Sequence, residues 1–574
     1  MQYGGIHFVD WLALGAYLVG ITILGVWTAK RIKNTTDFFM GGRQFSKLMM
    51  VFFAFGAGTS GNQAVGVAAK SYERGFSGIW YQWLWLFATP FYWIIAPAFR
   101  RMRAITLGDF FQYRYSHSTA VLYAAVGILI HMTTMGVMLL ASGKLVQAIS
   151  GGAISSSVAI VVMTVLFLAY GVAGGLSAAI ITDFIQGILT LVLSFLVLPF
   201  ALQAVGGFAG LHEKISDPNV FELVAPGEIN TFFIVMFALN VLVGIVTQPH
   251  IMGVCAAGRT ELDGRVGFAT GNLLKRFCTI AWMLTGVCAI ALYQVDDADL
   301  VYGIVARDLL PQIFPGLVGL FLAALLASVM SSCDAYMVSS AGLFTQNIYR
   351  PYFAPGRTEA HYVLVGRLAA FGIVAGGLVF AFSLGDVPAG LKLFWKFTAI
   401  MAPAFWLGLY WRRATVQAAW ASAFALGIVL LLTSQDFFKA WAVENLPETM
   451  IYTEVLADGG IRQTFRESWQ ILFLLTAGFG TGLVVSLLTK PCPQAQLDRF
   501  FRCIHTPVNK GEPNPTEPFQ LPEGIEAATP KRLIDAGGLE IPAPTKLGMA
   551  GFGAFSLAVV AMIWFVNWLT TWGA

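Results

Sequence analysis

Long apolar segments recur along the whole chain and leave few folds open to it. Many of them reach the length of about 18 residues at which an apolar run reads as a helix that crosses a bilayer. Apolar residues make up 57% of the 574 residues and charged residues only 11%, about half the charged share of a soluble domain. The sequence therefore predicts an all-α membrane protein with about fourteen transmembrane helices. We expect them near residues 8–28, 46–69, 77–99, 118–142, 154–173, 177–204, 231–254, 274–293, 316–347, 362–384, 390–410, 415–433, 467–489 and 548–571.

Composition also excludes several classes of function. The net charge of +4 is small, and the basic residues lie in short loops, which is typical of membrane topology and not of nucleic-acid binding. The six cysteines show no paired CxxC spacing, so a disulfide framework or zinc site is not expected. The sequence contains no HExxH, GxSxG or His/Asp cluster, and we do not expect an enzyme. The N-terminus has no basic segment or cleavage site, so the first apolar run is expected to be a retained span.

Basic residues predict the orientation of the chain. They cluster in every second loop, for example after the first span (Lys30, Arg31, Lys33) and after the eleventh (Arg412, Arg413). Loops rich in Lys and Arg stay in the cytoplasm. We therefore expect a multi-pass protein of the cell's inner (plasma) membrane, with the N-terminus outside. An even number of spans places the C-terminus outside as well.

Two long polar segments interrupt the apolar pattern. Residues 434–466 are expected to be extracellular, and residues 490–547 cytoplasmic. Within the second segment, Leu497, Phe500, Phe501 and Ile504 recur at helical spacing. This pattern predicts a short helix on the inner membrane surface; the alternative is a solvated linker.

The ninth span carries polar residues where a lipid-facing helix would avoid them. Ser328, Ser331, Ser332 and Asp334 follow one another within two turns. A carboxylate at mid-membrane costs at least ~2.5 kcal/mol on insertion scales. We therefore expect this helix to face a protein-lined or wet cavity and to hold a cation.

The second span is rich in glycine at the same depth. The segment FGAGTSGNQAVG (Phe55–Gly66) holds four glycines, a serine and a threonine. In secondary transporters, broken helices of this kind offer backbone carbonyls to Na⁺. Close packing of helices through small residues is the alternative. Hydroxyls, carbonyls and a carboxylate together suit a hard cation such as Na⁺.

Other spans carry isolated candidates for function. Asp183 lies inside the sixth span; it is either functional or an interfacial carboxylate near the cytoplasmic end. Gln248 and His250 lie in TQPHIMG at the end of the seventh span, where His250 could carry a proton but better suits a capping or gating role. Lys396 lies about two turns inside the eleventh span, where it could pair with Asp334, bind an anionic substrate group, or be purely structural.

Several motifs in order resemble the sodium/solute symporter family, the group of the sodium/glucose and sodium/proline transporters. They are DFFMGGR (37–43), the glycine-broken second span, ITLGDFFQYRY (105–115), GGLSAAIITDFIQ (174–186), TQPH (247–250) and SVMSSCDAYMVSSAGLFTQNIY (328–349). The motifs cover roughly residues 1–415. Later segments resemble a little-characterised bacterial branch of the family.

The resemblance implies the leucine-transporter fold, with two inverted five-helix repeats and alternating access. The chain would then divide into the first span and its loop (1–45), the first repeat (46–204), an extracellular loop (205–230) and the second repeat (231–413). Additional spans (414–489), the cytoplasmic segment (490–547) and the last span (548–574) follow.

The resemblance also implies a sodium site between the first and eighth core helices. Its positions match the carbonyls of Gly56, Thr59 and Ser328 and the hydroxyls of Ser331 and Ser332. Some members hold a second sodium at positions that match Asp183 and the neighbourhood of Asp334. This chain has Asp334 and Ala335 where those members have hydroxyls, so a second cation or a proton could lie there.

The predicted function is a sodium-coupled symporter that imports a small polar or anionic solute, with Na⁺ as the coupling ion. A sugar pocket is not expected, since Gly58 and Gln63 stand where sugar transporters place Asn and His. The candidate substrate residues are Asn62, Gln63, Gln82, His131 and Lys396, although His131 also suits a structural role in the core. A proton-coupled symporter and a non-transporting solute sensor remain alternatives. The expected partners are the solute, sodium and the lipid bilayer, with no nucleic acid, and a monomer is the family's default.

Overall fold

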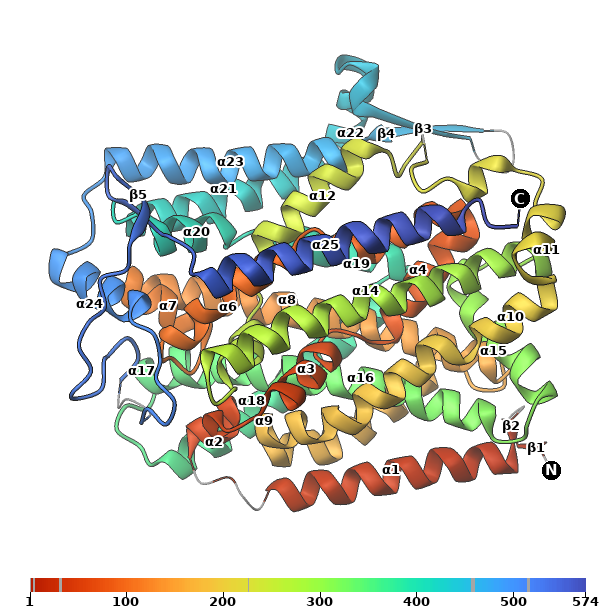
Figure 1. Cartoon of the computed structure of the whole chain (residues 1–574), viewed down its shortest axis with the longest axis horizontal. Coiled ribbons are helices and arrows are strands. Elements are labelled where there is room, and N and C mark those ends of the chain that lie inside the picture. Colours follow the sequence, from red (N-terminus) through yellow and green to blue (C-terminus); the bar gives the residue numbers. More distant parts are fainter. Residues whose placement is uncertain are drawn as a thin grey trace.

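The computed structural model describes residues 2–3, 6–29, 32, 34–225, 227–455, 460–513 and 517–573. Lys30, Arg31 and Lys33 of the first basic loop lie outside the described residues. Most helices run roughly parallel to the longest axis of the molecule (Figure 1). Helix α1 (Phe8–Ala29) begins, and helix α25 (Lys546–Leu569) ends, at the same end of the molecule (Figure 1).

The first half of the chain forms ten further helices. They are α2 (Thr35–Met40), α3 (Lys47–Gly56), α4 (Gly61–Arg74), α5 (Trp80–Trp83), α6 (Thr89–Arg101), α7 (Leu107–Arg114), α8 (His117–Ile149), α9 (Ser156–Leu196), α10 (Leu198–Val205) and α11 (Gly207–Lys214).

The second half forms the remaining helices. They are α12 (Thr231–Gly244), α13 (His250–Ala256), α14 (Glu261–Leu292), α15 (Val301–Leu309), α16 (Leu317–Gly342), α17 (Arg350–Tyr352), α18 (Glu359–Ser383), α19 (Val387–Thr398), α20 (Ala402–Tyr410), α21 (Val416–Ser434), α22 (Asp436–Asn445), α23 (Glu467–Leu488) and α24 (Gln494–His505). A π-helical segment, Leu343–Tyr349, continues α16.

Three two-stranded antiparallel sheets accompany the helices, so the chain is mainly but not purely helical. They pair β1 (Gln2–Tyr3) with β2 (Ile6–His7), β3 (Ile451–Val455) with β4 (Ile461–Phe465), and β5 (Arg532–Ala536) with β6 (Leu539–Pro542). The prediction of an all-α chain is wrong at these points. The strands lie in segments outside the spans. The apolar periodicity that predicts the helices is absent there, so it could not predict the strands.

The number of helices that can cross a membrane differs from the expected fourteen. Ten helices among the described residues are long and apolar enough, or eleven if the bent pair α12–α13 counts as one span. The other expected spans, at 46–69, 77–99 and 154–173, are helical but broken, short or merged with a neighbour. Helix α9 runs through two expected spans and is kinked at Gly175, whose φ of 54° is unfavourable for residues with a side chain.

Two helix breaks set the geometry of the interior. The chain between α3 and α4 is not helical, and Gly58 in it has a φ of +111°. Helices α12 and α13 meet at an angle of 74°, and Pro249 stands at the start of α13. Each break falls in the first helix of a predicted repeat, as expected if the two repeats share one architecture.

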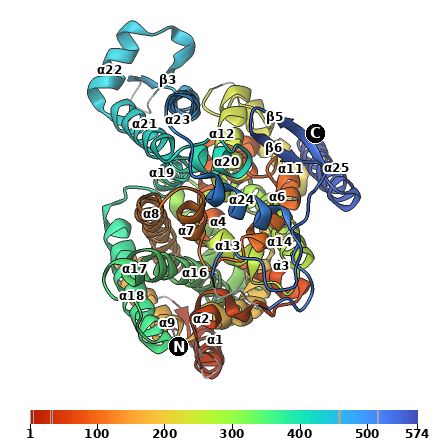
Figure 2. The ribbon, with the colours of Figure 1, turned by 90° about the vertical axis from the view of Figure 1, so that its left-hand side faces the viewer.

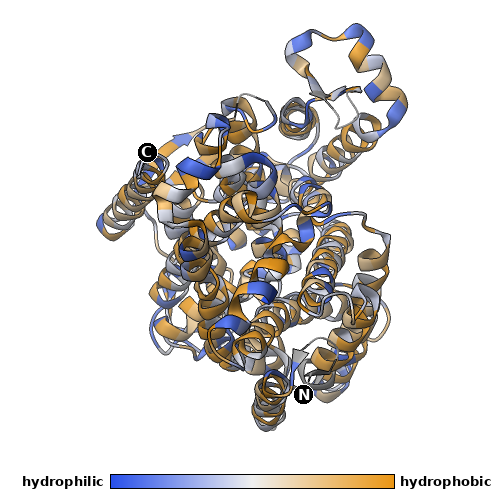
Figure 3. Ribbon diagram, turned by 90° about the vertical axis from the view of Figure 1, so that its right-hand side faces the viewer, coloured by the Kyte–Doolittle hydropathy of each residue, from blue (hydrophilic) through white to orange (hydrophobic). Residues whose placement is uncertain are grey.

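Helix α16 is the most deeply enclosed of the long helices. In its most apolar stretch, 89% of the residues are buried inside the protein, against 17% for α1 and 11% for α25. Figure 2 shows it inside the bundle, with α25 at the periphery. Apolar residues run along most of the bundle helices, whereas hydrophilic residues recur in the α22–β3–β4 segment that projects from them (Figure 3). We call the end of the molecule that carries this segment the hairpin end.

Helix α24 forms where the sequence predicted a helix, but its apolar face is covered by protein. Leu497, Phe500, Phe501 and Ile504 are all buried in the protein. Phe500 packs against Phe110 with ring centroids 5.4 Å apart. The expectation that this apolar face rests on lipid is therefore wrong, because other parts of this chain cover it.

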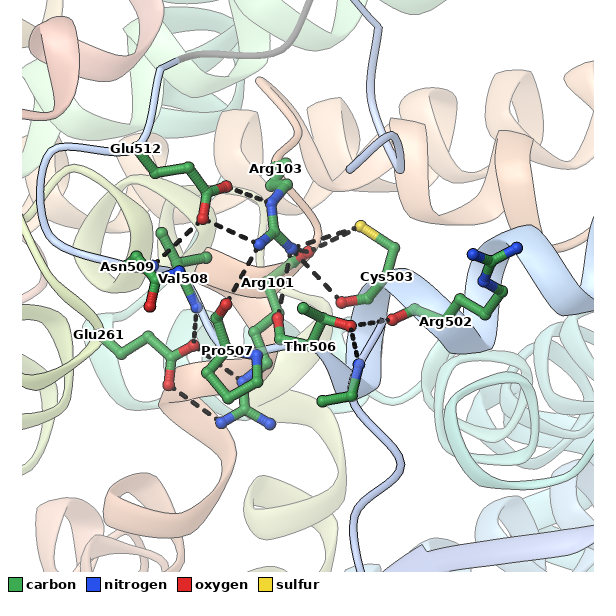
Figure 4. A network of polar contacts seen from close by, with 11 residues as sticks. Arg101, Arg103, Glu261, Arg502, Cys503, Thr506, Pro507, Val508, Asn509 and Glu512 are labelled. Atoms are coloured by element: carbon green, nitrogen blue, oxygen red, sulfur yellow. Dashed lines mark hydrogen bonds and ion pairs between the residues drawn. The ribbon is translucent and has the colours of Figure 1, made fainter. Parts of the chain in front are cut away.

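A buried cluster around Arg103 attaches the segment after α24 to the helical bundle (Figure 4). The Arg103 guanidinium donates to both carboxylate oxygens of Glu512, at 2.5 and 3.1 Å, and to the carbonyls of Thr506 and Pro507. Both side chains of the Arg103–Glu512 pair are almost fully enclosed, at 0% and 1% exposure. The segment from α24 to Glu512 is thus held by a charge pair that loses its compensation if either member is removed.

We expect Arg103→Gln to release the segment around 506–513. Removing one partner of a buried ion pair costs about 3–5 kcal/mol, because the other charge stays buried without compensation. The measurement is the rate of cleavage by proteinase K within this segment, together with the thermal unfolding midpoint. Arg502→Ala is the matched control, since Arg502 is exposed and its side chain points away from the cluster (Figure 4). Equal cleavage rates for the wild type and Arg103→Gln would contradict the assignment.

Candidate functional site

The break between α3 and α4 is held open by a side chain of α16. The Ser332 hydroxyl donates to the Gly56 carbonyl (2.8 Å) and accepts from the Gly58 N–H (3.1 Å). The Gln63 side-chain amide donates to the Gly58 carbonyl. Unwound backbone at this depth needs such partners, since lipid cannot supply them.

Oxygen atoms from three helices converge beside Gly56. A Cβ added at Gly56 would overlap the Ser331 hydroxyl and lie 3.4 Å from Oδ2 of Asp183. Ser331 and Asp183 are fully buried. The Ser331 hydroxyl and the Asp183 carboxylate interact with each other, and among the described residues neither has a further hydrogen-bond partner. Buried oxygen atoms in this condition suit a hard cation.

The other residues of the expected sodium site lie around the same point. The Thr59 N–H donates to the Gly56 carbonyl at 3.1 Å. The Ser328 hydroxyl donates to the Leu325 carbonyl within its own helix, so it does not point a free oxygen at the break. The family resemblance implies that Ser328 contributes its carbonyl, which this intrahelical hydrogen bond leaves unaffected.

Two carboxylates lie on the α9–α16 side of this group. Asp183 and Asp334 are both buried and interact electrostatically. Tyr17 of α1 is near both, and its hydroxyl accepts from the Gln186 amide at 3.0 Å. Two neighbouring carboxylates cannot both remain charged without a cation or a proton between them. The arrangement therefore suits a second positive charge.

A central pocket lies on the opposite side of the helix break. Its volume is about 40 Å³, which is room for a few water molecules and much less than the about 300–1,000 Å³ of typical ligand pockets. Five of the predicted polar residues line it: Asn62, Gln63, Gln82, Gln248 and His250.

Two predicted substrate residues do not line this pocket. His131 lies behind His250, with ring nitrogens 3.2 Å apart; it contacts the Ser340 hydroxyl at 2.8 Å and stacks on Tyr336. His131 therefore supports His250 from behind and does not face the pocket. Lys396 lies in a different cavity and pairs with Glu467 at 3.2 Å. Its role in solute binding stays a prediction, but it does not line this pocket, because α19 presents Lys396 toward the start of α23.

Lys275 and Arg276 of α14 also line the pocket, and the sequence analysis missed them. The eighth span is predicted to begin at residue 274, so both cations fall at the edge of that span, near the expected membrane boundary. Helix α14 begins at Glu261, so both lie near its middle. The signal was two adjacent charges inside GNLLKRFC, with apolar residues on both sides.

Both cations are buried and neither forms an ion pair with a carboxylate among the described residues. Lys275 Nζ donates to the Ala57 carbonyl in the helix break at 3.3 Å, and it would lie 3.2 Å from a Cβ at Gly58. Arg276 donates to Oε1 of Gln82 at 3.0 Å and lies over the Trp85 ring at 5.7 Å. The neutral oxygen atoms of Ala57 and Gln82 stabilise these two charges only in part. The pocket therefore favours the binding of an anion.

The sequence of this chain matches a known family over most of its length. A model of the sodium:solute symporter family aligns with residues 38–425, more than half of the chain. The chain belongs to the sodium:solute symporter family. The predicted resemblance is confirmed, and the family is one of transporters and not of enzymes.

Curated relatives of this symporter transport different solutes. The osmoregulated proline transporter OpuE of Bacillus subtilis (strain 168) is 24% identical over 85% of this chain and 96% of the relative. The sodium/glucose cotransporter of Vibrio parahaemolyticus is 24% identical, covering 78% and 88% of the two chains. The sodium/pantothenate symporter of Haemophilus influenzae is 25% identical, covering 70% and 86%.

A solved structure shares the fold. The substrate-bound, outward-open Na⁺-coupled sialic acid symporter matches 85% of this chain and 99% of its own, with a TM-score of 0.70 and 17% identity. The symporter therefore has the leucine-transporter fold. It is a multi-pass membrane protein, its partners are a small solute and sodium, and sodium is the coupling ion.

We expect Ser332→Ala to weaken sodium binding. The variant loses the hydroxyl that joins α16 to the Gly56 carbonyl and the Gly58 N–H, a loss worth about 1–1.5 kcal/mol or a roughly tenfold higher sodium concentration at half-saturation. The measurement is sodium-dependent uptake or solute binding. Ser422→Ala is the control, since Ser422 is buried in α21 and donates only to the Ala419 carbonyl. Unchanged sodium dependence in Ser332→Ala would exclude this residue from the site.

Proposed function

We propose that this symporter imports a small anionic solute, and that the solute's negative group binds between Lys275 and Arg276. The observation that supports this is the pair of buried cations without a carboxylate partner among the described residues. A buried charge without compensation is costly, and a bound anion removes that cost. Asn62, Gln63, Gln82 and Gln248 then supply the neutral hydrogen bonds around the rest of the solute. The relatives' printed solutes are too diverse to choose among, so this proposal rests on the pocket itself.

The sodium ion is proposed to bind on the other side of the same helix break. Gly56, Thr59 and Ser328 would supply carbonyls, and Ser331 and Ser332 hydroxyls. Asp183 and Asp334 would share a second sodium ion or a proton. The two ligands then meet the same few residues of backbone from opposite sides, so the binding of one biases the conformation that the other needs.

Transport requires the central pocket to open, since about 40 Å³ does not hold a solute. Gln248 and His250 lie at the 74° bend between α12 and α13 and are proposed as gating residues. We propose that the hairpin end and both termini face the outside of the inner membrane, as the basic loops predict. Alternating access would then carry the solute from the hairpin end toward the α24 end. A monomer is sufficient for this cycle.

We expect proteoliposomes containing the protein to accumulate a small carboxylate from a panel only when sodium is higher outside. Lys275→Gln should weaken apparent solute affinity at least about tenfold, because a hydrogen bond between charged groups is worth about 1.5–3 kcal/mol. Lys275→Arg should retain part of it, because the charge remains. Lys490→Gln is the control, since Lys490 is exposed at the end of α23.

Three outcomes would contradict the proposal. Uptake that follows a proton gradient and ignores sodium would favour a proton-coupled symporter. Solute binding without accumulation would favour a sensor. Unchanged solute affinity in Lys275→Gln would remove the anion from the central pocket.

A further inference from the structure

We infer that a second cavity, at the hairpin end, is a separate binding site for a small carboxylate anion. This outer cavity is bounded by α4, α19, the start of α23, the loop before α12 and the β3–β4 hairpin. Its volume of about 560 Å³ falls in the range of ligand pockets. It is open in the conformation in which the central pocket is closed.

The outer cavity carries an excess of positive charge. Six cationic side chains line it against three carboxylates: Lys70, Lys392, Lys396, Lys439, Arg462 and Arg466 against Glu228, Asp386 and Glu467. Two of these cations also have carboxylate partners just outside the lining, Glu73 for Lys70 at 2.6 Å and Asp436 for Lys439 at 3.0 Å. One positive charge of the lining therefore remains without an offsetting carboxylate (six minus five). A cleft with one sign of charge and low-dielectric walls concentrates ligands of the opposite sign.

Two carboxylates in the outer cavity are shared by several cations. Lys392 Nζ lies 2.9 Å from Glu228 and 3.0 Å from Glu467. Lys70 and Arg74 approach the other oxygen of Glu228 at 3.9 and 3.7 Å. Burial acts to raise the pKa of Glu228, but Lys392, Lys70 and Arg74 lower it to about 2, so this carboxylate is charged at physiological pH. The negative charge of Glu228 is already offset by Lys392, Lys70 and Arg74.

Lys396 is a largely enclosed cation that shares its carboxylate partner with a second lysine. Its side chain is 12% exposed, and its carboxylate partner is Glu467, which Lys392 also uses. Helical spacing places Lys392 and Lys396 on one face of α19, and both line the cavity. A ligand carboxylate accepting from Lys396 would supply the missing negative charge.

A layer of aromatic side chains separates the outer cavity from the central pocket. Tyr81 lies under Lys70 and Lys392, with 5.6 and 5.9 Å from each nitrogen to the ring centroid, and its hydroxyl donates to Glu228 at 3.2 Å. Tyr81 also packs on Trp395, and Trp395 packs on Trp85, which lines the central pocket. An anion in the outer cavity therefore touches none of the central cations, and the two sites can be tested separately.

The hairpin forms one wall of the outer cavity and is tied to the transport core. The Arg74 guanidinium of α4 donates to the Tyr452 hydroxyl of β3 at 3.2 Å. Arg466 donates to the Ile451 carbonyl at 2.8 Å. Helix α4 is the second part of the broken helix, so an anion bound here lies between the transport core and the peripheral hairpin.

The test measures thermal unfolding of the full-length protein in lipid nanodiscs. Sodium acetate, succinate, citrate and benzoate are compared with sodium chloride at equal sodium concentration and ionic strength. We expect at least one carboxylate to raise the unfolding midpoint of the wild type and of Lys275→Gln, which leaves the outer cavity intact. In Lys396→Gln the apparent dissociation constant should rise at least about tenfold, and Lys396→Arg should restore most of the effect.

Lys144→Gln is the matched control. Lys144 is also a partly buried lysine shared by two carboxylates, Asp297 and Asp299, both at 2.9 Å, but it does not line the outer cavity. The inference would be overturned if no carboxylate raised the unfolding midpoint more than sodium chloride does. It would also be overturned if the rise were lost in Lys275→Gln and kept in Lys396→Gln. Uptake of the stabilising anion into proteoliposomes would identify it as the transported solute, and binding without uptake as a separate ligand; either supports the outer site. Failure of the central-pocket proposal would instead appear as unchanged uptake affinity in Lys275→Gln.

Discussion

The hydroxyl of Ser332 makes the contact on which the arrangement of the interior depends. It joins the most enclosed helix, α16, to the carbonyl of Gly56 and the N–H of Gly58 at the point where α3 ends. Without it, the Gly58 N–H would lose its partner and the Gly56 carbonyl would keep only the Thr59 N–H, and losses of this kind are costly inside a membrane protein. The same contact brings Ser331 beside Asp183 on one side of the break. On the other side, it leaves the Ala57 carbonyl facing Lys275.

Polar residues in apolar helices made much of this site predictable. Ser331, Ser332 and Asp334 stood out because a lipid-facing helix would not carry them, and Gly56–Gly66 because glycine weakens a helix. Sequence spacing could not show which side of a helix meets which cavity. His131 and Lys396 are polar residues in spans like the others, yet one supports His250 from behind and the other meets Glu467. Those outcomes depend on contacts more than 70 residues apart along the chain.

The missed cations have a different cause. The predicted eighth span begins at residue 274, so Lys275 and Arg276 fall in its first turn and do not stand out as charges inside a helix. The helix extends thirteen residues further toward the N-terminus (274 minus 261), as its first residue Glu261 shows. Its first turn is fixed by a capping box between Thr260 and Asp263, which the apolar pattern alone does not detect. The short strands β3–β6 were missed for a related reason, since they lie in polar segments without a strong periodic signal.

The separation of charges across the helix break has a consequence for bioenergetics. If a monovalent anion crosses with one sodium ion, the pair carries no net charge, and the membrane voltage does no work on the cycle. A second positive charge beside Asp183 and Asp334 would make each cycle electrogenic. A voltage of about 100 mV would then add ~2.3 kcal/mol, or an accumulation about 50-fold higher. The occupancy of the carboxylate pair therefore decides whether this symporter draws on the chemical gradient alone or also on the electrical one.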